Sequence, residues 1–261
     1  MSILSDHSTY EVYGPLGGLA TTVVLPEAFD KAHDKCPLAV LMHGFMSNKE
    51  LFPLPELACA LAKEGIASVR FDFDAHGESE GRFVDMTLST EMADAKAVLE
   101  YVCNMPFVTA IALIGHSQGG VIAGMLAGEM ENQPERPCCL VQLAPAAVLK
   151  DDALAGRCMN AKYDAANPPE SVSVFCQEVG RVYFLESQNL PIYETSAKYT
   201  GRVCIIHGEK DKIVPISYSE RYHQSYNDCE LHILQGEGHM LDCDKTGLIK
   251  LVTTFLTDNL Q

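Results

Sequence analysis

The sequence has few basic residues and no long apolar runs, and each of these shortages excludes a class of function. It holds 19 Lys and Arg against 35 Asp and Glu, a formal net charge of −16 that is spread along its length. A surface of this sign repels polyanions, so nucleic acid is not expected as a partner. No stretch reaches the roughly 18 apolar residues of a membrane span, and the opening MSILSDHSTY lacks the basic start and apolar run of a secretory signal. These shortages predict a cytoplasmic protein without membrane association.

The spacing of the cysteines argues against a structural metal. The ten cysteines include no C-x-x-C pair, so no zinc site is predicted. Free cysteines in apolar stretches behave as small buried hydrophobes, as expected in a reducing compartment. Those that lie in such stretches are Cys59, Cys103, Cys138, Cys139 and Cys204. A chain of 261 residues, 47% of them apolar, can bury a sizeable core without disulfides or metals.

Short apolar runs alternate with stretches of helical spacing along most of the chain. The runs predict strands at residues 21–25, 38–42, 66–71, 111–115, 140–144, 203–207 and 231–234. The helical spacing covers residues 50–64, 88–104, 118–130, 216–226 and 245–258. Such alternation is typical of an α/β fold, in which a mostly parallel sheet carries helices on both faces.

The alternation stops in the second half of the chain. The next core strand is delayed over residues 147–199, a mixed stretch that contains Asn167-Pro168-Pro169 and is too long for a plain loop. We expect an inserted cap over the carboxyl ends of the strands, where open α/β sheets bind ligands. The core would then consist of residues 1–146 and 200–261.

The strongest motif is Gly115-His116-Ser117-Gln118-Gly119-Gly120, a G-x-S-x-G pattern between a predicted strand and a predicted helix. In this context the turn is sharp and presents the serine hydroxyl at the start of the helix. Glycines flank the serine because a side chain at either position would collide with neighbouring backbone. The pattern predicts that Ser117 is a nucleophile.

A serine hydroxyl needs a base to take its proton and a carboxylate to orient that base. His239 lies in GEGHML after the last predicted strand, and Asp211 lies in HGEKDKIVP after the strand at 203–207. The order Ser117, Asp211, His239 is the one that α/β-hydrolases use. Other carboxylates remain alternatives for the acid, and these are Glu209, Asp242, Asp151 and Asp152.

Acyl transfer also needs donors for the oxyanion of the transition state. The main-chain amide of Gln118 follows the nucleophile directly, and the amide of Phe45 follows His43-Gly44 after the strand at 38–42. A triad with two such amides needs neither a metal nor an organic cofactor, so none is expected.

Several segments resemble the cinnamoyl (feruloyl) esterases of gut and rumen bacteria. They are HGF at 43–45, SVRFDFDAHGESEG at 68–81, GHSQGG at 115–120, LAPAA at 143–147, LPIYE at 190–194 and HGEKD at 207–211. The resemblance covers nearly the whole chain and implies an α/β-hydrolase fold with an eight-stranded sheet and a small cap. It also implies hydrolysis of hydroxycinnamate (ferulate, caffeate or p-coumarate) esters of sugars, quinate or small alcohols.

The resemblance further implies that Asp152 and Tyr183 hold the phenolic hydroxyl of the substrate. A carboxylate that accepts a phenol O–H forms a short, charge-assisted hydrogen bond. Asp152 could instead cap the helix that begins at DALAG, where Asp is favoured. Some members of the family carry an amide side chain seven residues after this Asp, whereas this chain has Met159.

The sequence therefore predicts a serine carboxylesterase for small hydroxycinnamate esters. One alternative is an esterase, monoacylglycerol lipase or thioesterase for aliphatic acyl groups. Another is a binding protein on the same scaffold that has lost catalysis, although all three triad positions are filled. The alcohol half of the substrate and the oligomeric state stay open, a homodimer being one alternative.

Overall fold

One sheet runs through the computed structural model, which describes residues 5–6 and 9–260. Its strands are β1 (Ser5–Asp6), β2 (Thr9–Gly14), β3 (Gly17–Val24), β4 (Cys36–Met42), β5 (Ala67–Phe71), β6 (Val108–His116), β7 (Cys139–Leu143), β12 (Arg202–Gly208) and β13 (Cys229–Leu234). Eight of them follow the order β1-β3-β5-β4-β6-β7-β12-β13, and β2 pairs with β3. Every neighbouring pair from β5 to β13 is parallel, whereas β3 is antiparallel to its partners. The predicted, mostly parallel sheet is confirmed.

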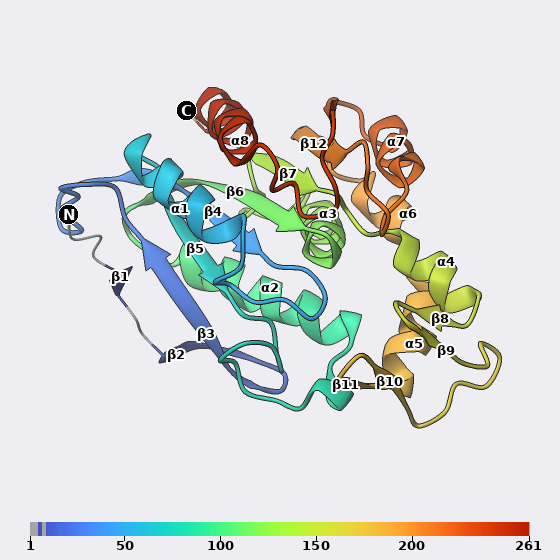
Figure 1. The fold of residues 1–261 in the computed structure, drawn as a ribbon. Coiled ribbons are helices and arrows are strands. Elements are labelled where there is room, and N and C mark those ends of the chain that lie inside the picture. Colours follow the sequence, from blue (N-terminus) through green and yellow to red (C-terminus); the bar gives the residue numbers. More distant parts are fainter. Residues whose placement is uncertain (1–4, 7–8, 261) are drawn as a thin grey trace.

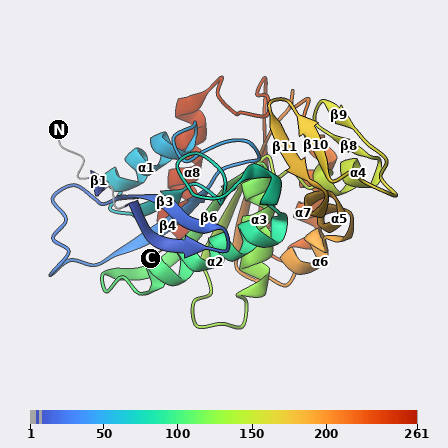
Figure 2. The same ribbon diagram turned by 90° about the horizontal axis from the view of Figure 1, so that it is seen from below.

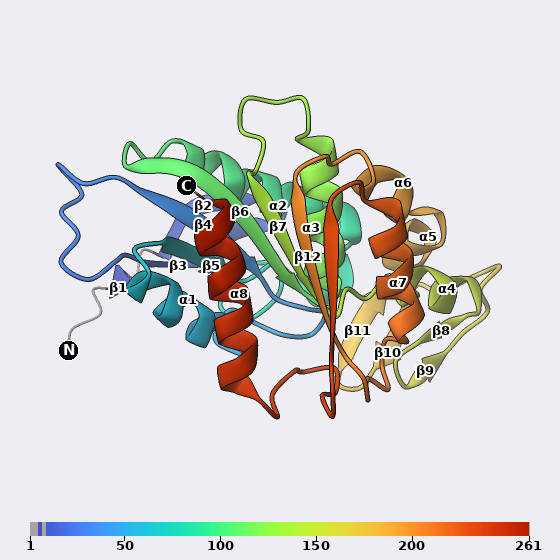
Figure 3. The same ribbon diagram turned by 90° about the horizontal axis from the view of Figure 1, so that it is seen from above.

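Helices cover both faces of the sheet. They are α1 (Leu54–Lys63), α2 (Leu88–Cys103), α3 (Gln118–Glu129), α7 (Ile216–Ser225) and α8 (Lys245–Asn259), with a 3₁₀ turn η1 (Phe83–Asp85) before α2. Side chains alternate between the faces: Leu38 and Val40 of β4 join the apolar cluster under α2 and α3, and Leu41 joins the one under α1 and α8. Accordingly α2 and α3 lie in front of the sheet in Figure 2, and α8 lies in front in Figure 3.

A further set of elements lies between β7 and β12, within residues 147–199. It comprises α4 (Val148–Leu154), β8 (Arg157–Cys158), β9 (Ala161–Lys162), β10 (Ser171–Val174), β11 (Gln177–Gly180), α5 (Arg181–Asn189) and α6 (Ile192–Ser196). The strands form two small antiparallel hairpins, β8–β9 and β10–β11, apart from the main sheet. In Figure 1 these hairpins, α4 and α5 lie together beyond the carboxyl ends of the central strands.

Local chemistry explains where the elements depart from prediction. Helix α1 begins at Leu54 rather than near residue 50, with Pro53 at its N-cap and Pro55 in its first turn, where a missing N–H costs nothing. Cys138 was expected to be buried but is exposed, because β7 begins one residue later. All ten cysteines are free. No helix of the described residues is long and apolar enough to cross a membrane.

Candidate active site

Ser117 occupies the sharp turn between β6 and α3. Its backbone has φ 56° and ψ −121°, a left-handed conformation that costs free energy for a residue with a side chain. The flanking glycines allow the turn, since a Cβ at Gly115 would lie 2.1 Å from the Gly119 carbonyl oxygen and one at Gly119 would lie 2.3 Å from that of His43. The main chain locks it, because the Ser117 N–H donates to the Leu143 carbonyl at 2.8 Å. The serine therefore stands on a strained, tightly packed bend.

His239 and Asp211 meet Ser117 at the carboxyl edge of the sheet. The Nε2 atom of His239 lies 2.9 Å from the Ser117 Oγ, and its Nδ1 lies 2.7 Å from Asp211 Oδ2. The carboxylate would accept the Nδ1 proton and leave Nε2 free to accept from the serine. The structure thus brings together the three side chains that the sequence singled out, from positions up to 122 residues apart.

The side chain of Asp211 is fully buried, and its carboxylate is surrounded by hydrogen-bond donors of the protein. Burial opposes its ionisation, but hydrogen bonds from His207 and His239 and from the main-chain N–H of Val214 outweigh burial and lower the pKa of Asp211. His207 is itself held by Ser219 and by the Val214 carbonyl. The acid is therefore ionised at neutral pH and suited to stabilising an imidazolium on His239.

His116 anchors the loop that carries His239. Its Nε2 donates to the His239 main-chain carbonyl at 2.9 Å, and the two rings lie 5.1 Å apart. Burial, followed by the proximity of His239, lowers the pKa of His116 to about 4, so its imidazole is neutral at pH 7. The sequence did not predict this contact, because nothing in the motif reveals a partner over a hundred positions away.

The loop after β4, which carries Phe45, lies against the serine. An added Cβ at Gly44 would lie 2.8 Å from the Ser117 Cβ, so the loop touches the nucleophile. Buried Lys49 secures it, since its N–H and its Nζ donate to the two carboxylate oxygens of Asp72 at 2.6 and 3.0 Å. Within the described residues, neither the Phe45 nor the Gln118 main-chain N–H donates a hydrogen bond to the protein. Both are available to an oxyanion.

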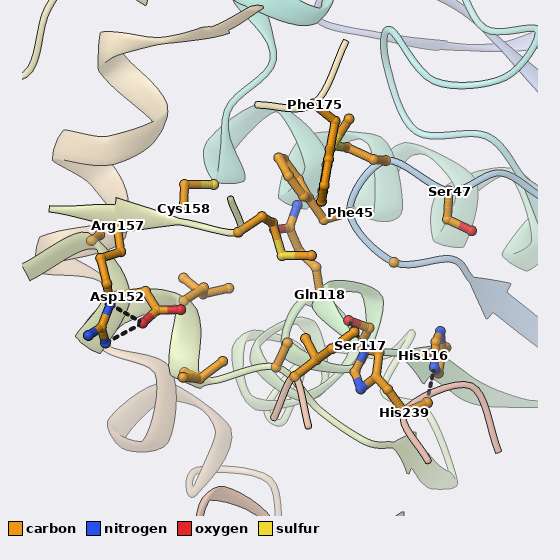
Figure 4. A pocket seen from close by; sticks show the side chains of 18 of the residues that line it. Phe45, Ser47, His116, Ser117, Gln118, Asp152, Arg157, Cys158, Phe175 and His239 are labelled. Atoms are coloured by element: carbon orange, nitrogen blue, oxygen red, sulfur yellow. Dashed lines mark hydrogen bonds and ion pairs between the residues drawn. The ribbon is translucent and has the colours of Figure 1, made fainter. Parts of the chain in front are cut away.

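A cavity of about 530 Å³ opens over Ser117. Most of its wall is apolar, and several exposed side chains surround it, with Met159 and Phe175 being 49% and 57% exposed. The ring of Phe45 stacks on Tyr183 with centroids 5.5 Å apart. The charged side chains that line the cavity are Asp152, Arg157 and Lys212. In Figure 4, Ser117 and His239 lie at one end of the cavity and Asp152 at the other.

Asp152 lies inside α4, which begins at Val148 with Ala147 as its N-cap. The alternative that Asp152 caps this helix is therefore wrong, because the helix starts four residues earlier than DALAG suggested. Both Nε and Nη2 of Arg157 donate to Asp152 Oδ1, at 3.2 and 2.8 Å. No hydrogen bond to Oδ2 is found within the described residues, so that oxygen can accept from a ligand.

Tyr183 also lines the cavity, but its hydroxyl has a protein partner. It donates to Gln118 Oε1 at 2.7 Å, and Gln118 Nε2 donates to Glu91 Oε2 at 2.7 Å. Glu91 of α2 is 1% exposed, and burial raises its pKa to about 8, so it is protonated at neutral pH. The sequence pointed to Tyr183 only through the resemblance and did not point to Glu91 at all, since a Glu in a helix is usually solvated.

The other candidate acids lie elsewhere or have other partners. Glu209 accepts from the Gly236 N–H, and Asp151 accepts from the Tyr218 hydroxyl at 2.6 Å. Among the described residues, side chains that could hold a metal ion gather in two places: Cys204, Glu230 and His232, and also Glu237, Asp242 and Cys243. In the first group the Arg202 guanidinium already bonds Glu230 at 3.1 Å, which disfavours a further cation there.

A family profile matches this chain over residues 34–168, just over half of its length. The family is described as serine aminopeptidase, S33, within a hydrolase group. The chain belongs to this S33 family. It is accordingly a serine hydrolase of the α/β-hydrolase fold, and its sheet and nucleophile turn agree with that assignment.

Solved and curated proteins resemble this S33 member to different extents. The structure of Est1E from Butyrivibrio proteoclasticus with bound ferulic acid is 28% identical, with a TM-score of 0.87 over 93% of this chain and 95% of that one. The mitochondrial palmitoyl-protein thioesterase ABHD10 of Mus musculus is 24% identical over 72% of this chain and 63% of its own length. An uncharacterised 31.7 kDa protein of Escherichia coli is 29% identical over 119 residues, 45% of this chain. The match spans only 38% of that protein's length.

Proposed function

We propose that this chain hydrolyses carboxylic esters of hydroxycinnamic acids such as ferulate, caffeate and p-coumarate. The observation that carries the proposal is that the hydrogen-bonded Asp211–His239–Ser117 triad borders a cavity with aromatic side chains in its wall. At the far end of this cavity, the Oδ2 atom of Asp152 has no hydrogen bond within the described residues. A flat aromatic acyl group would contact the Phe45 ring, and its phenol would reach Asp152. The likeness to Est1E with bound ferulic acid supports the same substrate class.

The mechanism follows from the geometry. Ser117 Oγ attacks the ester carbonyl while His239 Nε2 accepts its proton across 2.9 Å, and Asp211 stabilises the resulting imidazolium. The Phe45 and Gln118 main-chain amides stabilise the oxyanion. His239 then protonates the leaving alcohol, and an acyl-enzyme on Ser117 remains. Water activated by His239 then attacks the acyl-enzyme, and the acid leaves as Ser117 regains its proton.

An esterase or thioesterase for aliphatic acyl groups is the second candidate. It is favoured by the exposed apolar side chains at the cavity mouth and by the similarity to a palmitoyl-protein thioesterase. An aminopeptidase activity, as in the family's description, has less support. The free amino group of a peptide needs an anion whose charge is not already compensated, and Arg157 compensates the charge of Asp152, the acid in the cavity wall. The Oδ2 atom of Asp152 can still accept a hydrogen bond from a neutral phenol.

Four substrates with one enzyme preparation separate these functions. We expect kcat/KM for ethyl ferulate to exceed that for ethyl butyrate at least about tenfold, because the aromatic ring and phenol both bind. A palmitoyl thioester and leucine p-nitroanilide complete the set, and Ser117→Ala is the control for contaminating hydrolases. Equal or faster cleavage of butyrate would reject the aromatic specificity in favour of the aliphatic one. Preferred cleavage of the anilide would support the peptidase.

A further inference from the structure

Buried His43 holds the carbonyl group of the next residue, Gly44. The His43 Nδ1 atom lies 2.8 Å from the Gly44 carbonyl oxygen, and the Phe73 main-chain N–H donates to His43 Nε2 at 3.0 Å. A carbonyl oxygen can only accept and a main-chain N–H can only donate, so the hydrogen of the neutral imidazole is on Nδ1. The two contacts together fix one tautomer, in which His43 donates to Gly44.

The surroundings of His43 keep its imidazole neutral. The residue is 1% exposed, and its ring packs against the rings of Phe73 and His76 with centroids 5.0 Å apart in each case. Burial, followed by the proximity of His76, lowers the pKa of His43 well below its ordinary value, and His116 and Lys49 act in the same direction. The donor on Nδ1 is therefore present at neutral pH without a charge.

A tight turn holds the same carbonyl from a second direction. The Ser47 N–H donates to the Gly44 carbonyl at 3.1 Å and closes a turn in which Met46 has φ 55°. Such turns favour glycine at this position, because a left-handed conformation costs free energy for a residue with a side chain. The carbonyl oxygen accepts two hydrogen bonds, which uses both of its lone pairs. The orientation of the peptide between Gly44 and Phe45 is thereby fixed.

The planarity of this peptide transmits its orientation to the Phe45 amide. The peptide is trans, and in a trans peptide the C=O and the N–H point in opposite directions. His43 and Phe73, on the carbonyl side, are not among the residues that line the cavity, whereas Phe45 and Ser117 line it. An added Cβ at Gly44 would lie 3.3 Å from the Ser117 Oγ. With its carbonyl held away from the cavity, the peptide turns its N–H toward the cavity beside the nucleophile.

We propose that His43 is a positioning residue for the oxyanion: its Nδ1–H holds the Gly44 carbonyl behind the cavity wall, so that the Phe45 N–H points at the charge that develops on the substrate carbonyl. The inference rests on the proposed function, of which it uses only acyl transfer at Ser117 and not the nature of the acyl group. His43 itself touches no substrate. A donor that is aimed before the substrate binds stabilises the transition state without the cost of reorientation.

Two variants separate the Nδ1 donor from the bulk of the ring. His43→Leu removes both nitrogens and should lower kcat for ethyl ferulate about a hundredfold with little change in KM, because a misplaced oxyanion donor affects the transition state more than the bound ester. The factor should be the same for ethyl butyrate, since both esters form the same oxyanion. In His43→Asn the side-chain NH₂ takes the place of Nδ1 and can donate to Gly44, so activity should return to within about tenfold of wild type.

An inhibitor that forms a tetrahedral adduct reports on the oxyanion directly. An aryl trifluoromethyl ketone accepts Ser117 Oγ at its carbonyl carbon, the serine proton passes to His239, and the ketone oxygen becomes the oxyanion. Its Ki should rise across the His43 variants by about the factor by which kcat/KM falls. A Ki that stays constant while kcat/KM falls would overturn the proposal, because the variants would then leave oxyanion binding intact.

His76→Leu is the matched control. His76 is also buried and packs against the His43 ring, but its Nδ1 donates to the Asp74 carbonyl, and within the described residues it has no hydrogen bond to the loop after β4. Its kcat should stay close to that of wild type. A loss equal to that of His43→Leu would show that any disturbance of this cluster slows the reaction, and that outcome rejects a specific role for His43.

A merely structural role for His43 gives a different pattern. His43→Asn would then lose as much as His43→Leu, or the loss in both would lie in KM rather than kcat, and either result overturns the proposal. If His43→Leu does not fold, His43→Gln replaces it, because its amide lies one bond further out, at the place of Nε2, and does not reach Gly44. Equal activity of the Asn and Gln variants is then the fatal outcome.

The same variants separate this inference from the proposed function. Wild-type enzyme that prefers ethyl butyrate to ethyl ferulate rejects the hydroxycinnamate specificity, and the role of His43 is then decided on butyrate. Wild-type enzyme that cleaves neither ester but is labelled by a fluorophosphonate rejects the esterase. The labelling rates then decide on His43, because the phosphoryl oxygen takes the place of the carbonyl oxygen, and equal rates in wild type and His43→Leu overturn its role. Wild-type enzyme that is not labelled either rejects both.

Discussion

The edge of the sheet and the segment between β7 and β12 position their polar groups by different means. At the sheet edge, Ser117 is held by main-chain hydrogen bonds in a turn that admits little movement, and Asp211 is fully buried among donors. In the segment between β7 and β12, Asp152 is held by the half-exposed Arg157, and neighbouring side chains such as Phe175 are open to solvent. The difference indicates that chemistry depends on the rigid edge and selectivity on the more open segment.

Removal of the nucleophile should have the largest effect among the tests of this comparison. Ser117→Ala should reduce kcat by about a millionfold, because loss of a triad serine removes the covalent route entirely. The loss should be equal for aromatic and aliphatic esters and should abolish labelling by a fluorophosphonate. Initial rates on ethyl ferulate and ethyl butyrate measure it. Unequal losses on the two substrates would break the comparison.

Asp211→Asn should have the next largest effect. An amide cannot hold His239 in the required tautomer, and such a change costs about ten-thousandfold in kcat. The loss should again be the same on both substrates. Asp151→Asn is the matched control, since Asp151 bonds Tyr218 outside the triad, and it should stay close to wild type. A comparable loss in Asp151→Asn would mean that the acid has been assigned to the wrong residue.

Asp152→Ala tests the other region. It should lower kcat/KM for ethyl p-coumarate about a hundredfold while leaving the unsubstituted cinnamate ester little changed, because only the phenol loses a charged partner. Glu170→Ala, at a highly exposed acid of the same segment, is the control. Equal losses on both esters would show that Asp152 supports the fold of the segment rather than the ligand.

The smallest expected effect concerns stability and pH. Glu91 has a pKa of about 8 in the folded protein, above its ordinary value of 4.5, so it keeps its proton on folding while the unfolded chain releases it. As the pH rises from 4.5 to about 8, the free energy of unfolding of the wild type should fall relative to that of Glu91→Gln. The fall should be at most about 1.4 kcal/mol per pH unit. Urea unfolding at about pH 5.5 and about pH 7.5 measures the trend.

The matched control for this trend is Glu129→Gln, an exposed position on α3. A free-energy difference between wild type and Glu91→Gln that stays constant with pH would show that Glu91 is ionised in the core. The relay to Tyr183 would then have a charged end, and its hydrogen bonds would be correspondingly stronger.

Most of the fold and the three central side chains of the site could be predicted from local patterns. Each core strand from 38–42 onward was found to within a few residues, because buried parallel strands read as continuous apolar runs. The start of β3 was not, because its glycines have weak strand propensity, and neither was β1, which has only two residues. β2, with the sequence TYEVYG, was missed although its residues favour strands. In the segment between β7 and β12, the hairpins and the position of Asp152 within α4 were missed, because short elements depend on tertiary packing more than on a local sequence pattern.

Sequence alone determined the turn around Ser117 and the order in which the acid and the base follow it, since backbone sterics at Gly115 and Gly119 act within a few residues. Only the tertiary structure decided which groups meet across the chain: His116 with the His239 loop, Lys49 with Asp72, and Glu91 with Tyr183 through Gln118. Those contacts join residues many positions apart, and a buried hydrogen bond is specified by the direction and distance of both partners, which no local pattern contains.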